Sequence, residues 1–481
     1  MADRKSKIAT GLFYPAQGTD YYVFKISQSN LFMETQKKGV SDLLNMLMDR
    51  KYPLWLLRHS LGTSELPEDY TDRDAREYLS LKREAYVSRL YKQGTLRGLK
   101  YSGLKIPILE GCYSHAVGPI HAGVIEPGHF RFVVNGEQIQ NLEIRLGFQK
   151  RGILSKLVGC DPIRAMAIAE TISGDSTVAY SYAFSKAFES AFQWKVSPDV
   201  ELWRMVLLEV ERIAVHIGDM GAIAGDIGYY PLLGVCSTDR GVPLGFMETL
   251  VGNRMGKGAL YPGEVRANPK LVASDLKDIK KKLVALLRKI EIHFGKAARD
   301  STIRERLQNC GILRTTQAYT NGVIGMACRA TGMKLDLRYG QPLYSHAKEP
   351  LQLDHDPASF HGDAWSRFYL RFLEFQASSH WLLQVIETLN LDASGKGAFR
   401  VLKEKPEVKG SGPFYAGVEG WRGSNLVALL LNQNGTIKEA YIRDPSVLNW
   451  HALEIAIRGE LVGDFPLNNK SFNLSYVGVD L

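Results

Sequence analysis

The sequence predicts an α+β protein that is mainly helical, with small sheets at the periphery of a helical core. Apolar residues recur every three to four positions in three long stretches, which is the spacing of a helix that buries one face. These stretches are residues 198–219, 270–294 and 365–389. Shorter runs of β-branched and aromatic residues, bounded by Gly and Asn, indicate strands. We therefore expect helices to form the core and antiparallel hairpins to lie at its edges.

The first 105 residues are predicted to form a separate α+β segment. Residues 20–26 (DYYVFKI) have the aromatic and β-branched composition of a strand. Residues 40–61 and 72–91 have helical patterns, the second of them capped by Thr71 or Asp72. We divide the chain into domains 1–105 and 106–481.

Two hairpins are expected in the second domain. Residues 118–122, 126–132 and 133–137 are predicted to form strand, turn and strand, and Asn135-Gly136 is a strong two-residue hairpin signal. Residues 426–431 and 437–442 form the second predicted hairpin, around Asn434-Gly435. The glycine-rich segment before it, 409–425, is predicted to be a loop.

Composition indicates a globular protein without its own membrane span. The chain has 481 residues, of which 45% are hydrophobic and 23% charged. No apolar run approaches the roughly 18–20 residues that cross a bilayer. The N-terminal MADRKSKIATG has no hydrophobic region of a signal peptide, so we expect the protein to stay in the compartment where it is made.

The five cysteines are scattered, with no Cys-x-x-Cys pair. This distribution favours reduced, buried thiols over a disulfide framework. It also argues against an iron–sulfur cluster held by this chain alone, which would require closely spaced thiolates.

The formal charge of +9 allows nucleic acid, an anionic membrane surface or acidic partner subunits as binding partners. No zinc-finger spacing or RNA-binding aromatic motif accompanies the charge, so no nucleic-acid partner is expected. The lysine-rich stretch 276–294 has helical apolar spacing. Its charges indicate a solvated or partner-facing helix surface.

Three motifs follow one another from residue 151 to residue 228. They are RGILSKL (151–157), ETISGDSTVAYSYA (170–183) and LLEVERIAVHIGDMGAIAGDIG (207–228). In this order they resemble the large subunit of group 4, membrane-bound nickel–iron hydrogenases and its relative in complex I, the 49-kDa or D-type subunit. The resemblance extends over the chain from about residue 113 and implies a helical core with small peripheral sheets. Related hydrogenase subunits often carry a domain similar to the 30-kDa subunit of complex I, of which 1–105 would be a remnant.

The resemblance also shows which metal ligands this chain lacks. The family's two Cys-x-x-Cys motifs fall on Ser173–Ser176 and on Ser475–Gly478. A hydroxyl is a poor ligand for a soft metal, and glycine has no side chain. Tyr180 stands at a family histidine, Leu154 at the proton-relay glutamate, and Ser424 at an acidic residue that follows the retained Arg422-Gly423. The resemblance therefore implies a member of the family that has no nickel–iron centre and is not itself a hydrogenase.

In the complex I relative the same region binds the quinone head group. His121, in Gly118-Pro119-Ile120-His121, matches the histidine that faces the quinone there. An imidazole can donate a hydrogen bond or a proton to a quinone that is being reduced, although a histidine in a turn is often structural. The family's partner tyrosine has no equivalent, since Ile168 lies near its position. Tyr180 and Tyr182 would point about 200° apart on a helix, so at most one faces the site.

Other polar residues have two interpretations each. Asp175 is either a proton relay in the vacated site or, with Ser173, a candidate N-cap of the helix that follows. One helix face is shared by Glu209, Arg212 and His216. They form either a buried ion network that couples the site to membrane subunits or a structural salt bridge beside a core histidine. Arg151 and Arg422, retained where the family has arginines, would supply positive potential to the site or to an adjacent cluster.

The prediction is thus a peripheral electron-transfer subunit of a complex I-like or hydrogenase-related complex. The chain would lie on the cytoplasmic side of the plasma membrane, hold the pocket of a terminal acceptor, expected to be quinone, and bind no cofactor or metal itself. Partners would be an iron–sulfur small subunit of the complex I B type, a ferredoxin-like subunit, and membrane subunits of the complex I H type and of the antiporter type. Two alternatives stay open: a catalytically silent scaffold that docks the iron–sulfur subunit, and a different small acceptor such as a sulfur species. The candidate catalytic residues are His121 and Asp175, and the candidate pocket or cluster-facing residues are Arg151, Ser173, Ser176, Tyr180, Arg422 and Ser475.

Overall fold

The computed structural model describes residues 9–13, 20–26, 31–39, 111–121, 126–345, 351, 359–393, 406–410 and 412–481. In the N-terminal segment β1 (Ala9–Phe13), β2 (Asp20–Ile26) and β3 (Leu31–Gly39) form an antiparallel sheet. Strand β2 has the bounds predicted for it. The two predicted N-terminal helices lie outside the described residues, and the division at residue 105 stays a prediction.

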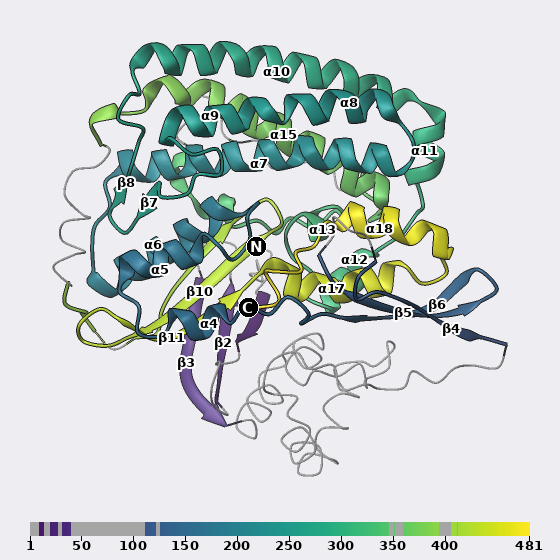
Figure 1. Cartoon of the computed structure of the whole chain (residues 1–481), viewed down its shortest axis with the longest axis horizontal. Coiled ribbons are helices and arrows are strands. Elements are labelled where there is room, and N and C mark those ends of the chain that lie inside the picture. Colours follow the sequence, from purple (N-terminus) through teal and green to yellow (C-terminus); the bar gives the residue numbers. More distant parts are fainter. Residues whose placement is uncertain are drawn as a thin grey trace, which may run out of the picture.

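The predicted helical core is confirmed. Helices α7 (Pro198–Asp226) and α15 (Ala364–Val385) pack against each other, and α10 (Ala273–Arg299) lies across α8 (Tyr230–Asp239), α9 (Gly241–Val251) and α15. Figure 1 shows α10 as the outermost helix of this stack. Helix α7 continues past the predicted end at residue 219, because small residues there let α8 approach. A Cβ atom at Gly221 would lie 2.6 Å from Cβ of Cys236 in α8.

Shorter helices connect the core to the sheets. They are α4 (Ile153–Leu157), α5 (Pro162–Ala169), α6 (Thr177–Phe192), α11 (Ser301–Leu307), α12 (Thr315–Thr320), α13 (Gly325–Arg329), α14 (Pro342–Ser345), α17 (Pro445–Ala456) and α18 (Phe465–Phe472). The 3-10 turns are η1 (Leu337–Gly340), η3 (Ile386–Thr388), η4 (Leu391–Ala393) and η5 (Val462–Asp464). Among the described residues no helix has the length and apolarity needed to span a bilayer.

Both predicted hairpins are present. Strands β4 (Tyr113–Val117), β5 (His129–Asn135) and β6 (Gln138–Arg145) form one antiparallel sheet, in which Asn135 pairs with Gln138 across the turn. Strands β10 (Ser424–Leu431) and β11 (Ile437–Arg443) form the second hairpin. A two-stranded ribbon, β7 (Leu260–Tyr261) with β8 (Glu264–Val265), lies beside the helices.

The prediction of a loop over 409–425 is wrong for part of that range. Strand β9 (Phe414–Glu419) forms there and pairs antiparallel with β10. It buries Ala416 and Val418 in the main core and packs against α6. The glycines that flank this strand have the composition of a loop, and the burial of two alternate small side chains is a weak sequence signal.

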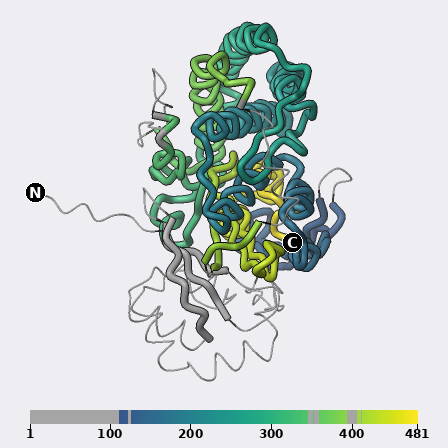
Figure 2. Tube along the Cα trace, turned by 90° about the vertical axis from the view of Figure 1, so that its left-hand side faces the viewer, coloured from purple at the N-terminus to yellow at the C-terminus, as the bar shows by residue number. Residues whose placement is uncertain are grey.

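Two apolar cores meet where the candidate residues lie. The larger one fills the space around α6, α7, α10 and α15. The smaller one joins β5 and β6 to α17 and α18, with Phe130, Trp450 and Tyr476 at its centre. Figure 2 shows the helical stack at one end of the molecule and the C-terminal segment beside the β4–β6 region. The turn after β4 and the last residues of the chain are thereby brought together.

Candidate functional site

An ion pair joins two segments that carry predicted site residues, the loop before α6 and the turn between β9 and β10. Asp175, in the loop before α6, accepts hydrogen bonds from Nη1 and Nη2 of Arg422, each at 2.7 Å. Arg422 lies in the tight turn between β9 and β10. The hydroxyl groups of Ser173 and Ser176 donate to Asp175 Oδ1 at 2.7 Å and 3.3 Å. Four of the eight predicted residues therefore form one cluster, which we call the Asp175–Arg422 cluster.

Glycine makes the position of Arg422 possible. Gly423 has φ +141°, and a Cβ atom there would lie 2.9 Å from Cα of Gly325 at the start of α13. The turn therefore presses against the backbone of another element, which any side chain at 423 would prevent. This close approach directs the guanidinium toward Asp175.

The prediction that Ser173 or Asp175 caps the next helix is wrong. The N-cap of α6 is Ser176, whose side chain makes no capping bond. Instead Glu211 of α7 accepts hydrogen bonds from the amides of Val178 at 2.7 Å and Ala179 at 3.3 Å. Because a carboxylate from another helix satisfies these amides, Asp175 is free to pair with Arg422.

Behind this cluster, side chains fill the interior. The hydroxyl of Tyr180 donates to Asp444 Oδ2 at 2.5 Å, and burial together with the neighbouring carboxylate holds the pKa of Tyr180 well above its usual range. Ser475 Oγ accepts a hydrogen bond from the amide of Gly478 at 2.9 Å. A Cβ atom at Gly478 would lie 2.3 Å from Asp444 Oδ2. No thiolate is present in this group, and a side chain at position 478 has no room, so these residues do not fit a nickel–iron group with soft ligands.

Tyr180 and Tyr182 point in different directions, as the helical spacing predicted. Tyr180 lies in the candidate site, whereas the hydroxyl of Tyr182 donates to Glu201 on α7. Only one of the two tyrosines therefore contributes to the site.

His121 lies in the turn after β4 and makes no hydrogen bond to the cluster. Its ring packs edge-on against Phe130, with the ring centroids 5.4 Å apart, and Phe130 contacts Tyr476 next to Ser475. The Nε2 atom of His121 is buried and has no hydrogen-bond partner among the described residues. Burial lowers the pKa of this imidazole. His121 therefore offers a neutral nitrogen whose hydrogen-bonding capacity is unused.

Arg151 holds the loop before Ser173 in place through hydrogen bonds to its backbone. Its Nη1 and Nη2 atoms donate to the carbonyl oxygens of Thr171 at 2.5 Å and Ile172 at 2.7 Å. These carbonyls immediately precede Ser173, so the guanidinium fixes the loop that carries Asp175. The structure does not place Arg151 in contact with the carboxylates of the site.

Sequence analysis missed two carboxyl groups close enough to Asp175 to interact with its charge, Glu126 and Glu211. Burial raises the pKa of Glu126, against the effect of the nearby amides of Val477 and Tyr476 and of Arg422. Burial likewise raises the pKa of Glu211 to about 8. For Asp175 burial acts in the same direction, but Arg422 outweighs it and the pKa is lowered. The site therefore combines one ionised carboxylate with two carboxyl groups that retain protons more readily.

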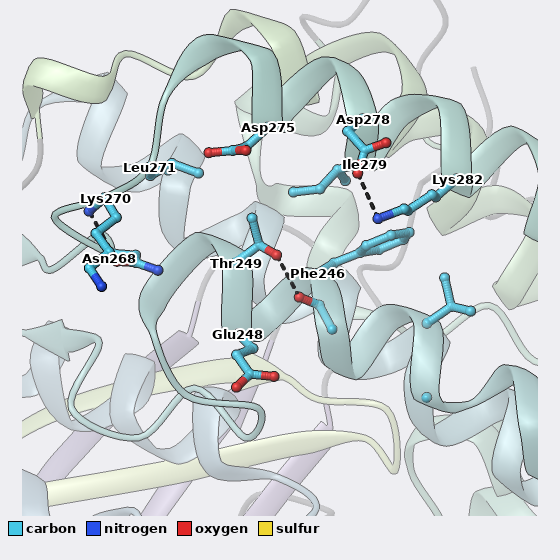
Figure 3. Close-up of a pocket in the computed structure, with 13 residues that line it drawn as sticks. Phe246, Glu248, Thr249, Asn268, Lys270, Leu271, Asp275, Asp278, Ile279 and Lys282 are labelled. Atoms are coloured by element: carbon cyan, nitrogen blue, oxygen red, sulfur yellow. Dashed lines mark hydrogen bonds and ion pairs between the residues drawn. The ribbon is translucent and has the colours of Figure 1, made fainter.

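The cavity in contact with this cluster is small. It has a volume of about 20 Å³ and is lined by Asp175, Glu211, Met247 and Met255 among others, which is room for a single water molecule. The Asp175 side chain is nevertheless 31% exposed, so the outer edge of the cluster is open. A larger cavity of about 690 Å³ is lined by residues of α9 and α10, and Figure 3 shows Phe246 and Lys282 among them. None of the predicted site residues lines that cavity.

No metal site was found in the described part of the chain, where no three His, Cys, Asp or Glu side chains are arranged to hold an ion. All five cysteines are free thiols, and Cys160, Cys236, Cys310 and Cys328 are buried. Burial raises the pKa of Cys236 to about 12 and that of Cys310 to about 11. The prediction of buried, reduced cysteines is confirmed for these four.

A buried ion network lies behind the site. Glu209 and Arg212 pair at 3.0 Å, and Glu374 of α15 contacts Arg212 at 3.5 Å and His216 Nε2 at 3.1 Å. The shared face predicted for Glu209, Arg212 and His216 is thus part of a larger cluster. Its further members are Arg329, Asp336, Arg338 and Glu419.

Trp421 connects this network to the site. Its ring packs edge-on against His216, with centroids 6.3 Å apart, and its Nε1 donates to the carbonyl oxygen of Asp175 at 2.8 Å. A single aromatic side chain therefore contacts both charged clusters.

Comparison with known proteins agrees with this architecture. Residues 226–405 match the family described as respiratory-chain NADH dehydrogenase, 49 Kd subunit. Membrane-bound hydrogenase subunit alpha of Pyrococcus furiosus is 25% identical over 365 residues, which cover 72% of this chain and 82% of that protein. The D-type subunit of NADH-quinone oxidoreductase of Carboxydothermus hydrogenoformans is 26% identical over 354 residues, covering 73% of this chain and 93% of that protein.

A solved structure shares the fold. A chain of the membrane-bound sulfane sulfur reductase, an archaeal respiratory membrane complex, superposes with a TM-score of 0.68 at 21% identity, covering 78% of this chain and all of that one. Fold and sequence together define a complex I-like oxidoreductase subunit. The chain is a homologue of the 49-kDa, D-type subunit of complex I and of membrane-bound hydrogenase large subunits, and the predicted resemblance is confirmed.

Proposed function

We propose that this chain is the acceptor-site subunit of a membrane-bound, complex I-like respiratory complex, and that the acceptor is a quinone. The chain docks on the cytoplasmic side of the membrane against an iron–sulfur small subunit. A ferredoxin-like subunit supplies electrons, and subunits of the complex I H type and of the antiporter type lie in the membrane. The name NADH-quinone oxidoreductase of a relative supports quinone as the acceptor, and the respiratory membrane complex that contains the similar solved structure supports membership of a membrane complex.

The observation that carries the proposal is the free Nε2 atom of His121. A buried polar atom without a partner costs free energy, so a structure retains it where something else binds. His121 lies in the turn that the complex I relatives use for the quinone head group. Part of the Asp175 side chain is exposed to solvent. We therefore place the acceptor at the boundary with the partner subunit and not in the interior, which side chains fill.

The chemistry follows from the charges around the site. Reduction of a quinone to a quinol takes two electrons and two protons. His121 donates a hydrogen bond from Nε2–H to one quinone oxygen, and as it gives up that proton it takes up another from solvent at Nδ1, so that the imidazole stays neutral. Glu211, whose pKa burial raises to about 8, holds a proton near neutral pH, and burial raises the pKa of Glu126 in the same direction. The Arg422 guanidinium stabilises negative charge on a half-reduced acceptor. Asp175 orients Arg422 and accepts hydrogen bonds from the Ser173 and Ser176 hydroxyl groups.

The chain in this proposal is not a hydrogenase. Ser173, Ser176 and Ser475 provide no thiolates, and Tyr180 with Asp444 occupies the interior. Elemental analysis of the natively isolated complex is expected to find iron from the partner subunits and no stoichiometric nickel. One nickel per complex would contradict this part of the proposal.

The test is reduction of a short-chain quinone analogue by the native complex, driven by reduced ferredoxin. His121→Ala is expected to lower turnover at least roughly a hundredfold, the scale on which a positioned proton donor acts. His115→Ala, at an exposed position of strand β4, is the matched control and is expected to keep turnover. The partner clusters must still be reduced in both variants. Equal turnover of His121→Ala and wild type would contradict the role of His121.

A specific observation favours a second candidate, the catalytically silent scaffold. The cavity at the cluster has only about 20 Å³, and protein groups satisfy Asp175 and Arg422. A scaffold predicts no turnover with any quinone while the clusters of the complex are still reduced. Because the relative in the solved structure belongs to a sulfane sulfur reductase, a sulfane-sulfur substrate is the further acceptor to include in the assay. Turnover with that substrate alone would replace quinone as the acceptor.

A further inference from the structure

Helix α10 carries an unusual share of the charge of the protein. Its 27 residues, ASDLKDIKKKLVALLRKIEIHFGKAAR, include eight Lys and Arg against three Asp and Glu. The apolar face of the helix, with Leu283, Leu286 and Ile290, is buried against the core. The helix is the outermost element of the stack, so its opposite face is turned away from the protein (Figure 1).

The acidic residues of α10 are all engaged at its flanks. Asp275 accepts the amide of Val272 at 3.0 Å, and Asp278 pairs with Lys282 at 2.6 Å, both beside the cavity of Figure 3. Glu291 accepts a hydrogen bond from Gln376 of α15 at 2.6 Å. None of these carboxylates is therefore left to neutralise the outer face.

The outer face consists of cations interleaved with apolar side chains. Helical geometry places six charged or large apolar residues within an arc of about 80°, together with the small residues Ser274 and Gly295. The six are Lys277, Lys281, Val284, Arg288, Ile292 and Arg299, and we call them the α10 stripe. The four cations are exposed and make no ion pair with any described residue, whereas Val284 is 52% and Ile292 47% exposed.

Like charges at this spacing destabilise a helix. Lys277 and Lys281 are four residues apart on one face, where two cations repel each other. A merely solvated helix usually interleaves Glu with Lys at this spacing. The stripe instead concentrates uncompensated positive charge around two exposed apolar residues, a combination that fits a partner with acidic and small apolar side chains in register.

We infer that the α10 stripe docks an acidic α-helix of another subunit in the same complex. This inference rests on the proposed membership of a complex, but its readout is independent of acceptor chemistry. From Lys277 to Arg299 the stripe spans about 33 Å, so it matches a partner helix of roughly 22 residues. Carboxylates of that helix pair with the four cations, and its apolar side chains cover Val284 and Ile292. Because α10 already buries its own apolar face, it cannot insert into a bilayer as an interfacial helix does.

The first test is zero-length carbodiimide cross-linking of the natively isolated complex, which joins a lysine amine to a carboxylate in direct contact. Lys277 and Lys281 are expected to be joined to Asp or Glu of a different subunit, as identified by mass spectrometry. The inference is overturned if these lysines are joined only to carboxylates of this chain or to none.

The second test is subunit retention in charge-reversal variants. Lys277→Glu/Lys281→Glu/Arg288→Glu is expected to weaken association of the cross-linked subunit roughly tenfold or more, as native mass spectrometry measures it. Lys195→Glu/Lys409→Glu/Lys438→Glu is the matched control, since it makes the same change of charge at exposed lysines elsewhere. The neutral variant Lys277→Gln/Lys281→Gln/Arg288→Gln replaces the reversal if that chain does not fold, and is expected to act in the same direction.

Two outcomes overturn the inference. In the first, the stripe variants retain every subunit at wild-type stoichiometry and affinity. In the second, they retain every subunit but lose binding to vesicles that contain phosphatidylserine, relative to vesicles of phosphatidylcholine alone. The latter result would assign the stripe to an anionic membrane surface.

Discussion

The two buried charge clusters of this protein contain the same residue types in different settings. In the network between α7 and α15, Glu209, Arg212 and Glu374 are at most 2% exposed, and each has several partners. In the Asp175–Arg422 cluster the carboxylate is 31% exposed and lies in a loop. The network is centred on two long helices, α7 and α15, and also includes residues of shorter elements, whereas the cluster lies entirely in a loop and a turn.

This difference indicates that the network between α7 and α15 supports the fold, whereas the Asp175–Arg422 cluster takes part in the chemistry. Loops on a rigid scaffold are where binding and catalytic residues concentrate. The network fixes α7 against α15 and positions Trp421, which in turn contacts Asp175. The cluster retains an exposed carboxylate, and nearby His121 retains a free nitrogen. Mutations should therefore affect stability in the first region and acceptor reduction in the second.

The largest expected effect is on Glu374 of the network. It contacts Arg329 at 2.8 Å, His216 at 3.1 Å and Arg212 at 3.5 Å. Glu374→Leu leaves buried guanidinium groups without compensation and is expected to lower the free energy of unfolding by about 3–5 kcal/mol. Urea unfolding, followed by circular dichroism, measures this change. Glu374→Gln, which keeps the shape of the side chain, should lose less, and a loss below about 1 kcal/mol in the Leu variant would contradict a supporting role.

An intermediate effect is expected in the pH dependence of stability. Burial raises the pKa of Glu211 from 4.5 to about 8, so the folded protein holds a proton that the unfolded chain releases. The stability that this carboxyl contributes is complete below about pH 4.5 and is lost as the pH rises toward 8. The slope is at most about 1.4 kcal/mol per pH unit.

Glu211→Gln removes this titration and keeps an acceptor for the amides of α6. The free energy of unfolding, measured from pH 5 to pH 8, should therefore fall less steeply in Glu211→Gln than in the wild type. Glu248→Gln, on α9, is the control and should follow the wild type. Parallel curves for Glu211→Gln and wild type would show that Glu211 is ionised in the folded protein.

The smallest stability effect is expected at the Asp175–Arg422 pair, because solvent screens its exposed side. A double-mutant cycle with Asp175→Asn and Arg422→Gln should give a coupling of about 1 kcal/mol. Acceptor reduction in Asp175→Asn should nevertheless fall more than in Glu374→Gln. The reverse order of activities would remove the distinction between the two regions.

Local patterns predicted much of the fold. The periodicity of α7, α10 and α15 extends over many turns, and Asn135-Gly136 marks its hairpin through a turn preference that depends on neighbouring residues alone. Strand β9 was missed because Gly417 and the glycines around it resemble a loop. Its place is determined by pairing with β10 and packing on α6, which are tertiary contacts.

The side-chain pairings in the site were harder to predict from the sequence than the fold. Asp175 and Arg422 are 247 positions apart, so no spacing rule predicts their pairing. Asp444 and Glu211 were missed for the same reason, since their partners belong to α6. The motifs did identify the loop that carries Asp175 and the turn that carries Arg422, because each of these segments has its own sequence pattern.

The most direct test of the account is photoaffinity labelling of the native complex with an azidoquinone. We expect the label on peptides of this chain that contain His121 or the C-terminal residues 473–481, suppressed by excess unlabelled quinone and strongly reduced in His121→Ala. Labelling confined to other subunits, in a complex that still reduces quinone, would contradict an acceptor site on this chain.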